Sequence, residues 1–178
     1  MSNWDVIAVG GSVSGLLAAK GVAEAGYTVQ LLEEDFEIGL PERCDGLISM
    51  NCLEKIGIAP KNNIIQNIIE RATFYSPSGI TAEVDARRQR VIVLDRSQFD
   101  RELAKIASKS GVDIKVGNKV TNKIEKDNIL RVETKSAVHS AKWVVNATGY
   151  SSLLNRKMTL QAAKFEVIGN WFDRDRVE

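Results

Sequence analysis

Residues 5–34 read DVIAVGGSVSGLLAAKGVAEAGYTVQLLEE, and this stretch decides the fold. The run Asp5–Val9 is short and continuously apolar, which is typical of a parallel strand buried on both faces. After a turn rich in glycine and serine, Leu16–Ala25 predicts a helix that ends at Gly26. Tyr27–Leu32 predicts a second strand. Strand, glycine turn, helix and strand within about 30 residues form a βαβ unit with a right-handed crossover.

The turn at residues 10–15, GGSVSG, joins the first predicted strand to the first predicted helix. Such a turn presents free backbone N–H groups at a helix N-terminus, where the helix dipole favours a pyrophosphate. In the fingerprint G-x-G-x-x-G, the glycines allow a tight turn, close approach of the phosphate and close packing of helix on strand. Gly10 and Gly15 stand at the first and third places. Ser12 stands at the second, where its side chain crowds the phosphate approach but its hydroxyl can donate a hydrogen bond.

An acidic residue follows the second predicted strand. Glu33 lies about 20 residues after the turn, where dinucleotide-binding folds place the carboxylate that accepts hydrogen bonds from ribose hydroxyls. The alternative is that Glu33 and Glu34 are two solvated carboxylates at the end of a strand. Turn, helix length and acid together predict a dinucleotide site. A carboxylate at this position disfavours NADP, because it repels a 2′-phosphate.

The other elements are expected in an order that interrupts the first domain. Residues 35–51 lack periodicity and predict an ordered loop. Helices are expected over Cys52–Ile58 and over Ser97–Ser110, the second with Ser97 as its N-cap. A hairpin is expected from Ala72–Tyr75 and Ile80–Val84. Further strands are expected at Arg90–Leu94, Val112–Val116, Asn118–Glu125, Ile129–Thr134, Ala137–His139, Trp143–Ala147 and Phe165–Gly169.

The return of the chain to an apolar strand near its end indicates a discontinuous domain. The predicted fold class is α/β, a Rossmann-like, three-layer domain that binds FAD or NAD(P). This domain is expected to comprise residues 1–70 and 95–150. Part of an inserted, β-rich substrate domain is expected over residues 71–94 and 151–178.

Composition narrows the function classes. Lys and Arg number 24 against 23 Asp and Glu, whereas a nucleic-acid-binding protein normally has a basic excess. Two cysteines are too few for a disulfide scaffold, and no metal-ligand spacing or nucleophile–base pair is recognisable. No basic leader precedes the first strand, and no run approaches the roughly 20 apolar residues of a membrane span. A cytoplasmic protein is expected, with peripheral membrane contact.

Four segments carry a resemblance to a known family. The stretch E-x-x-x-x-G-x-P-x-R-C ends at Cys44, DRSQFD spans residues 95–100, NKVTN spans 118–122, and NATGYSS spans 146–152. In order and spacing the chain resembles the geranylgeranyl reductases, above all the archaeal digeranylgeranylglycerophospholipid reductases. These are FAD enzymes of the para-hydroxybenzoate hydroxylase structural group.

The resemblance implies how FAD is held. Arg96 would lie near the ribityl and phosphate groups, the backbone of Val120 would meet the adenine, and Cys44 would lie near the flavin and the isoprenoid channel as the candidate catalytic residue. Asp45 replaces the family's usual glycine, and Thr148 stands where related flavoproteins often carry Asp. Together with the glycine turn, the expected FAD-contacting residues are Gly10, Ser12, Ser14, Gly15, Glu33, Arg43, Cys44, Asp45, Leu47, Arg96, Val120 and Gly149.

Individual residues also have simpler readings. Without the resemblance, Cys44 is an ordinary buried thiol. Arg96 could cap the helix that follows it through a surface pair with Asp100. Its position at the end of an apolar strand favours the cofactor role, since α/β sheets bind ligands there.

The implied reaction is saturation of isolated C=C bonds in geranylgeranyl chains of a membrane-lipid precursor, with ferredoxin or NAD(P)H as the electron donor. An FAD-dependent monooxygenase or halogenase of the same structural group is an alternative. A non-catalytic nucleotide-binding fragment is another. Family members normally run to about twice this length, and a later G-D segment and a Tyr-x-Trp-x-Phe-Pro stretch are missing, so a truncated and inactive chain is expected.

Overall fold

The computed structural model describes residues 3–126, 129–149, 165, 168–169 and 173–177. The chain forms two compact units, one of residues 1–41 with 100–161 and one of residues 42–99 with 162–178. This division differs from the expected boundaries in giving residues 42–70 and 95–99 to the second unit. Of the strand predicted over residues 165–169, residues 166–167 lie outside the described residues, and 165, 168 and 169 are not in a strand.

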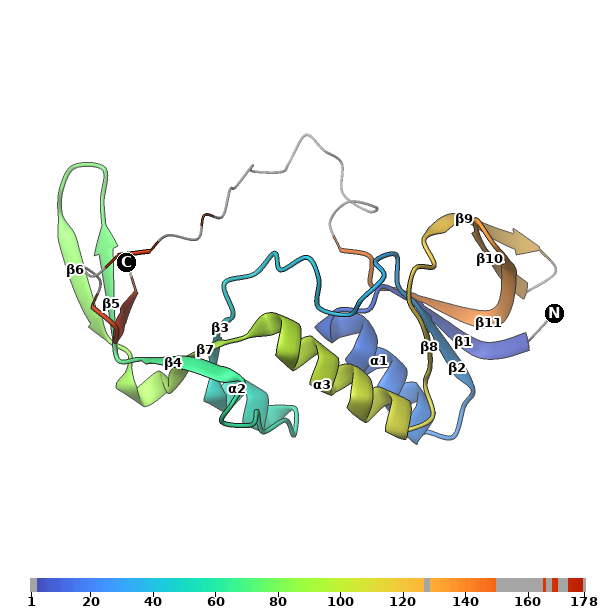
Figure 1. The fold of residues 1–178 in the computed structure, drawn as a ribbon, viewed down its shortest axis with the longest axis horizontal. Coiled ribbons are helices and arrows are strands. Elements are labelled where there is room, and N and C mark those ends of the chain that lie inside the picture. The colour runs from blue at the N-terminus through green and yellow to red at the C-terminus, as the bar shows by residue number, and fades with distance from the viewer. Residues whose placement is uncertain (1–2, 127–128, 150–164, 166–167, 170–172, 178) are drawn as a thin grey trace. The chain divides into compact units, whose positions relative to one another are not determined.

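The first unit is built on a six-stranded sheet in the order β8-β2-β1-β11-β10-β9 (Figure 1). Its four strands β8, β2, β1 and β11 are parallel, and β10 and β9 continue the sheet antiparallel. The bounds are β1 Asn3–Val9, β2 Val29–Leu32, β8 Asp113–Lys115, β9 Val120–Lys126, β10 Ile129–Thr134 and β11 Val138–Asn146.

The predicted βαβ unit is confirmed. Strand β1 pairs in parallel with β2, and helix α1 (Val13–Glu24) connects them. Residues Val6–Val9 are all buried, so both faces of β1 are covered, as its continuous apolar run indicates. The helix begins three residues earlier than expected, because Ser12 adopts the extended backbone conformation of an N-cap.

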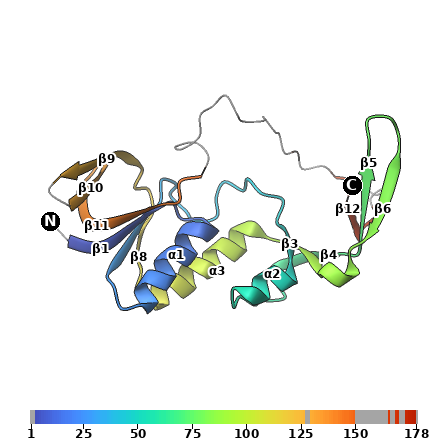
Figure 2. The same cartoon turned by 180° about the vertical axis from the view of Figure 1, so that it is seen from behind.

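Side chains from helix α1 and from the sheet make the core of this unit. Helix α1 buries Gly15, Leu16 and Ala19, and helix α3 (Arg96–Lys109) lies beside α1 in both views (Figure 1, Figure 2). Strand β10 contributes Val132 to a hydrophobic cluster with Ile7, Val9, Leu32 and Ala141. Both antiparallel strands therefore help to close the parallel part of the sheet.

One strand replaces two expected ones. The predictions at Ala137–His139 and Trp143–Ala147 are wrong in separating what is a single strand, β11. The residues between them look polar, but Ser140 and Ala141 are buried because each has a partner on both sides, β10 on one and β1 on the other.

The second unit contains two small sheets. One has the order β3-β7-β4 and is antiparallel, and the other has the order β12-β5-β6. The predicted hairpin is confirmed as β5 and β6. The bounds are β3 Leu47–Ser49, β4 Ile65–Ile69, β5 Arg71–Tyr75, β6 Thr81–Asp85, β7 Val91–Leu94, β12 Arg176–Val177, helix α2 Met50–Lys55 and a 3₁₀ turn at Arg87–Gln89.

Three local expectations in this unit are corrected. The loop expected over residues 35–51 includes β3, and β4 was not expected at all. The N-cap of α3 is Asp95 rather than Ser97, because Asp95 Oδ1 accepts hydrogen bonds from the Gln98 N–H and the Ser97 hydroxyl, each at 2.9 Å. An Asp at the N-cap satisfies a free N–H of the first turn.

Candidate functional site

The carboxyl ends of the four parallel strands meet along one edge of the first unit. Strand β2 lies on one side of β1 and β11 on the other, so the connections diverge at β1. In open α/β sheets, ligands bind outside the carboxyl ends of the strands at such a switch point. The segments that follow the four strands are residues 10–15 after β1, 33–38 after β2, 116–119 after β8 and 147–149 after β11.

The glycines of the first turn are required by close backbone contacts. Gly10 has a φ of 109°, and a Cβ there would lie 2.4 Å from the carbonyl oxygen of Ala147, which follows β11. A Cβ at Gly15 would lie 1.9 Å from the Gly10 carbonyl oxygen. The expected tasks of these two positions, a tight turn and close helix packing, therefore match the geometry.

Gly11 is a residue that the sequence reasoning missed. Its N–H donates a hydrogen bond of 2.5 Å to Glu33 Oε2. A Cβ at Gly11 would lie 2.5 Å from Ile38 Cδ1 and 2.9 Å from Glu33 Oε2. The available signal was the double glycine, which exceeds what the fingerprint needs.

The N-terminus of α1 is suited to an anion. Ser12 is exposed and its side chain makes no capping hydrogen bond; its hydroxyl instead donates to Asp100 Oδ2 at 3.4 Å. The first turn of α1 contains no acidic residue. Because the first N–H groups of a helix lack intrahelical partners and carry the positive end of its dipole, this turn favours a phosphate. Ser14 and Gly15 lie in this first turn.

Glu33 faces the glycine turn. Its backbone is held by β8 and the segment after it, since its N–H donates to the Lys115 carbonyl (2.9 Å) and its carbonyl accepts from the Asn118 N–H (2.7 Å). Its carboxylate accepts hydrogen bonds from the Gly11 N–H on Oε2 and from the Asp35 N–H on Oε1. A carboxylate has about four acceptor sites, which leaves capacity for hydroxyl donors.

The neighbouring acid is different. Glu34 Oε2 lies 2.7 Å from Lys119 Nζ in an exposed ion pair, and this hydrogen bond raises the pKa of Lys119. No ion pair to Glu33 is present among the described residues. The simpler reading of two equivalent solvated carboxylates is therefore wrong, because only Glu33 is directed at the turn.

Two further expected residues lie at the same edge. Val120 is half-buried at the start of β9, and Gly149 is exposed with a φ of 75°. The turn that leads to Gly149 is held by Asn146, whose Oδ1 accepts hydrogen bonds from the Thr148 hydroxyl (2.8 Å) and N–H (3.3 Å).

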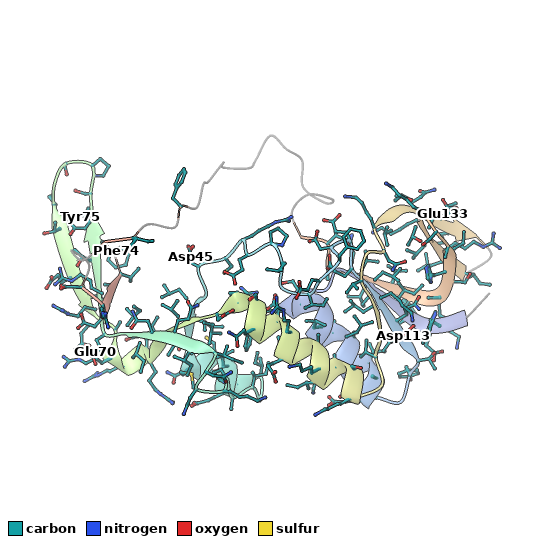
Figure 3. All side chains as sticks on the ribbon, viewed as in Figure 1. Asp45, Glu70, Phe74, Tyr75, Asp113 and Glu133 are labelled. Atoms are coloured by element: carbon teal, nitrogen blue, oxygen red, sulfur yellow. The ribbon has the colours of Figure 1, made fainter. Side chains whose placement is uncertain are left out.

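The remaining expected residues belong to the second unit. Arg43, Cys44, Asp45 and Leu47 are exposed, and Asp45 is labelled in Figure 3. Cys44 is exposed, so the reading as a buried thiol is wrong. Arg96 is half-buried in the first turn of α3.

Gly46 ties this loop to the end of β7. It has a φ of 76°, and a Cβ there would lie 2.1 Å from the Leu94 carbonyl oxygen. The Leu94 N–H donates to the Gly46 carbonyl at 3.0 Å. Within the second unit, the loop of Cys44 and Asp45 is therefore tied to the end of β7, next to Arg96.

The structure thus groups the expected residues by unit. The first unit brings together Gly10, Ser12, Ser14, Gly15, Glu33, Val120 and Gly149, and the second holds Arg43, Cys44, Asp45, Leu47 and Arg96. Among the described residues, no group of three or more His, Cys, Asp or Glu side chains could hold a metal ion. None of the described helices is long and apolar enough to cross a lipid bilayer.

Comparisons with known proteins add independent observations. A family model described as an FAD binding domain matches residues 3–174. Digeranylgeranylglycerophospholipid reductase of Methanoculleus marisnigri is 41% identical over 133 residues, covering 73% of this chain and 33% of the relative. Digeranylgeranylglycerophospholipid reductase 1 of Methanopyrus kandleri is 32% identical over 96% of this chain and 48% of the relative.

Solved structures agree on the fold. A geranylgeranyl bacteriochlorophyll reductase-like protein of Thermoplasma acidophilum has 27% identity and a TM-score of 0.75, covering 88% of this chain and 44% of that one. A myxobacterial chondrochloren halogenase has 20% identity and a TM-score of 0.68, and the match covers 85% of this chain and 38% of the halogenase chain. At this identity the similarity shows the fold alone. The chain spans between a third and a half of the length of these relatives.

Proposed function

This chain belongs to the family of FAD-binding domains, and we propose that its first unit binds the ADP half of FAD in the service of an isoprenoid-lipid reductase. The residues present fit the cofactor. The turn at residues 10–15 is made of close-packed glycines, the first turn of α1 has no acidic side chain, and the Glu33 carboxylate faces that turn.

Each part of the ADP moiety has a proposed partner. The N–H groups of Ser14 and Gly15, with the dipole of α1, hold the diphosphate. The Glu33 carboxylate accepts hydrogen bonds from the adenosine ribose hydroxyls. The observation that carries the proposal is the Glu33–Gly11 hydrogen bond, because it fixes the carboxylate beside the N-terminus of α1.

The second unit is proposed to serve both the flavin and the substrate. In this assignment the cofactor domain comprises residues 1–70 and 95–150, and residues 71–94 and 151–178 are part of a substrate domain. Arg96 assists the ribityl and phosphate groups, and the loop of Arg43, Cys44, Asp45 and Leu47 meets the flavin and the lipid. The exposed thiol of Cys44 and the tie between Gly46 and Leu94 are consistent with this role.

The proposed reaction is the saturation of C=C bonds in geranylgeranyl chains. Reduced FAD supplies the hydride that reaches one alkene carbon, and a proton reaches the other. Ferredoxin or NAD(P)H is the proposed electron donor, and a long apolar substrate calls for peripheral membrane contact. Support comes from the curated relatives at 41% and 32% identity, of which this chain spans less than half.

Two alternatives remain testable. A monooxygenase or halogenase would share the fold, but the halogenases and the p-nitrophenol monooxygenase that resemble this chain lie below 25% identity and bear on the fold alone. A non-catalytic nucleotide-binding fragment would bind ADP and FAD with equal affinity. Isothermal titration of the chain with both ligands separates this alternative from a site that also recognises the flavin.

The decisive experiment compares two neighbouring carboxylates. We expect Glu33→Gln to weaken FAD binding by about ten- to a hundredfold, since hydrogen bonds to a charged group contribute about 1.5–3 kcal/mol. Glu34→Gln is the matched control, because that carboxylate pairs with Lys119 at the surface, and it should leave the affinity within about twofold. Quenching of flavin fluorescence measures both.

The reaction is tested separately, by mass spectrometry of a digeranylgeranyl lipid incubated with the FAD-loaded chain and dithionite. A gain of two hydrogens per double bond would show that the chain itself is a reductase and would overturn the expectation of an inactive chain. FAD binding without a gain in mass is the outcome that the sequence predicts. Equal weakening by both substitutions, or no FAD binding at all, would refute the cofactor site.

A further inference from the structure

Phe36 is a conspicuous residue that the proposed function leaves unused. It stands three residues after Glu33 and its side chain is 88% exposed, whereas Ile38 in the same loop is only 7% exposed. Burial of a phenyl ring stabilises a protein. Because this loop buries Ile38 and leaves the larger Phe36 in water, it gives up stabilisation that the phenyl ring could provide.

The loop is held on both sides of Phe36. Before it, the Asp35 carbonyl accepts a hydrogen bond from the Gly117 N–H at 2.8 Å. After it, Glu37 Oε1 lies 2.9 Å from an Arg101 guanidinium nitrogen, and Ile38 is buried against Gly11. The outward position of the ring is therefore a property of the folded loop.

One edge of the ring rests on backbone. A Cβ at Gly117 would lie 2.9 Å from Phe36 Cδ1 and 3.0 Å from Cε1. Gly117 has a φ of 67° and no side chain to cover the ring. The ring is therefore supported from one side and open on the rest of its surface.

The position of Phe36 matches one part of the ligand, and this step rests on the proposed function. With the diphosphate at α1 and the ribose at Glu33, the base must extend past Glu33 toward the segments after β2 and β8. Phe36 and Gly117 lie in those segments. Glu34 and Glu37 nearby are paired with Lys119 and Arg101, so the ring stands among balanced charges, where a neutral base suits it.

We propose that Phe36 stacks on the adenine ring of FAD and gives the site its preference for a purine. Stacking of a base on an aromatic side chain is sensitive to the loss of the ring and tolerant of another aromatic residue. The role is one of binding and specificity, and it involves no chemical step.

The test is isothermal titration of the whole chain with ADP, UDP and FAD. Phe36→Ala should weaken ADP and FAD binding about tenfold or more and weaken UDP binding less, because a pyrimidine offers a smaller ring to stack on. Phe36→Trp should retain the affinity for ADP, with quenching of the new indole by the base. Phe74→Ala, which removes another exposed phenylalanine on the β5–β6 hairpin (Figure 3), is the matched control and should change the affinity for none of the three ligands.

The outcomes separate this inference from the function beneath it. If the unaltered chain binds FAD and Phe36→Ala binds ADP equally well, the stacking role is wrong and the FAD site stands. If Phe36→Ala weakens ADP and UDP alike, the purine preference is wrong. If the unaltered chain binds neither ADP nor FAD, both proposals fall together.

Discussion

Replacement of Gly15 by alanine tests the packing of α1 on the sheet. The added Cβ would lie 1.9 Å from the Gly10 carbonyl oxygen and 3.3 Å from Ala147 Cβ. The close contact is with backbone, which cannot swing aside, so α1 must move away from β1 by about 1–1.5 Å to restore a normal van der Waals distance. Overpacking of this kind costs typically 1–3 kcal/mol and occasionally more. We expect a loss of about 3 kcal/mol, or a Tm lowered by roughly 6–12 °C.

Gly21→Ala in the same helix is the matched control. A Cβ at Gly21 would meet no atom within 4 Å, and the position is exposed. The same substitution should therefore stabilise the chain by about 0.5–1 kcal/mol, because glycine is a poor residue inside a helix. Thermal and urea unfolding followed by far-UV circular dichroism measures both variants. A Gly15→Ala chain as stable as the Gly21→Ala chain would show that α1 does not pack as closely as argued here.

Two other substitutions address other parts of the fold. Lys142 and Thr28 lower the folded pKa of Asp5 to about 2, so its contribution is present above the unfolded pKa near 4 and is lost as the pH falls through about 2. Asp5→Asn should therefore flatten the stability profile between about pH 4 and 2 in acid titrations, and an unchanged profile would contradict the assignment. In Gly46→Ala the added Cβ would lie 2.1 Å from the Leu94 carbonyl oxygen. In the control Gly79→Ala the added Cβ would have no atom within 4 Å, so the only cost there is the positive φ, which both positions share. Urea unfolding should show Gly46→Ala as the more destabilising by about 1–3 kcal/mol, and equal losses would refute the close contact.

Local patterns were sufficient to predict the βαβ unit and the glycine turn and acid at its edge. The apolar run of β1, the glycines at positions 10 and 15 and the acid at position 33 lie within about 30 residues, so each constraint acts on its neighbours. The hairpin of β5 and β6 was predictable for the same reason, since its turn residues stand between its two strands.

Contacts between distant segments decided the rest. Strand β11 is one strand because β1 and β10, far from each other in the chain, pair with its two sides at Ser140 and Ala141. The short strand β3 exists because β7 lies beside it. Helix α3 is capped by Asp95 rather than by Ser97, because β7 ends at Leu94 and the helix begins two residues later, at Arg96.

The same division runs through the candidate site. The sequence by itself determined that a glycine turn and an acid would meet at the ends of neighbouring parallel strands, because strand, turn and helix periods are local properties of the chain. Only the tertiary structure decided that Glu33 rather than Glu34 faces the turn and accepts a hydrogen bond from the Gly11 N–H. It also decided that Phe36 is exposed while Ile38 is buried. Those choices depend on the Arg101 side chain of α3 and on the backbone N–H groups and Lys119 side chain of the segment after β8, which no local pattern places.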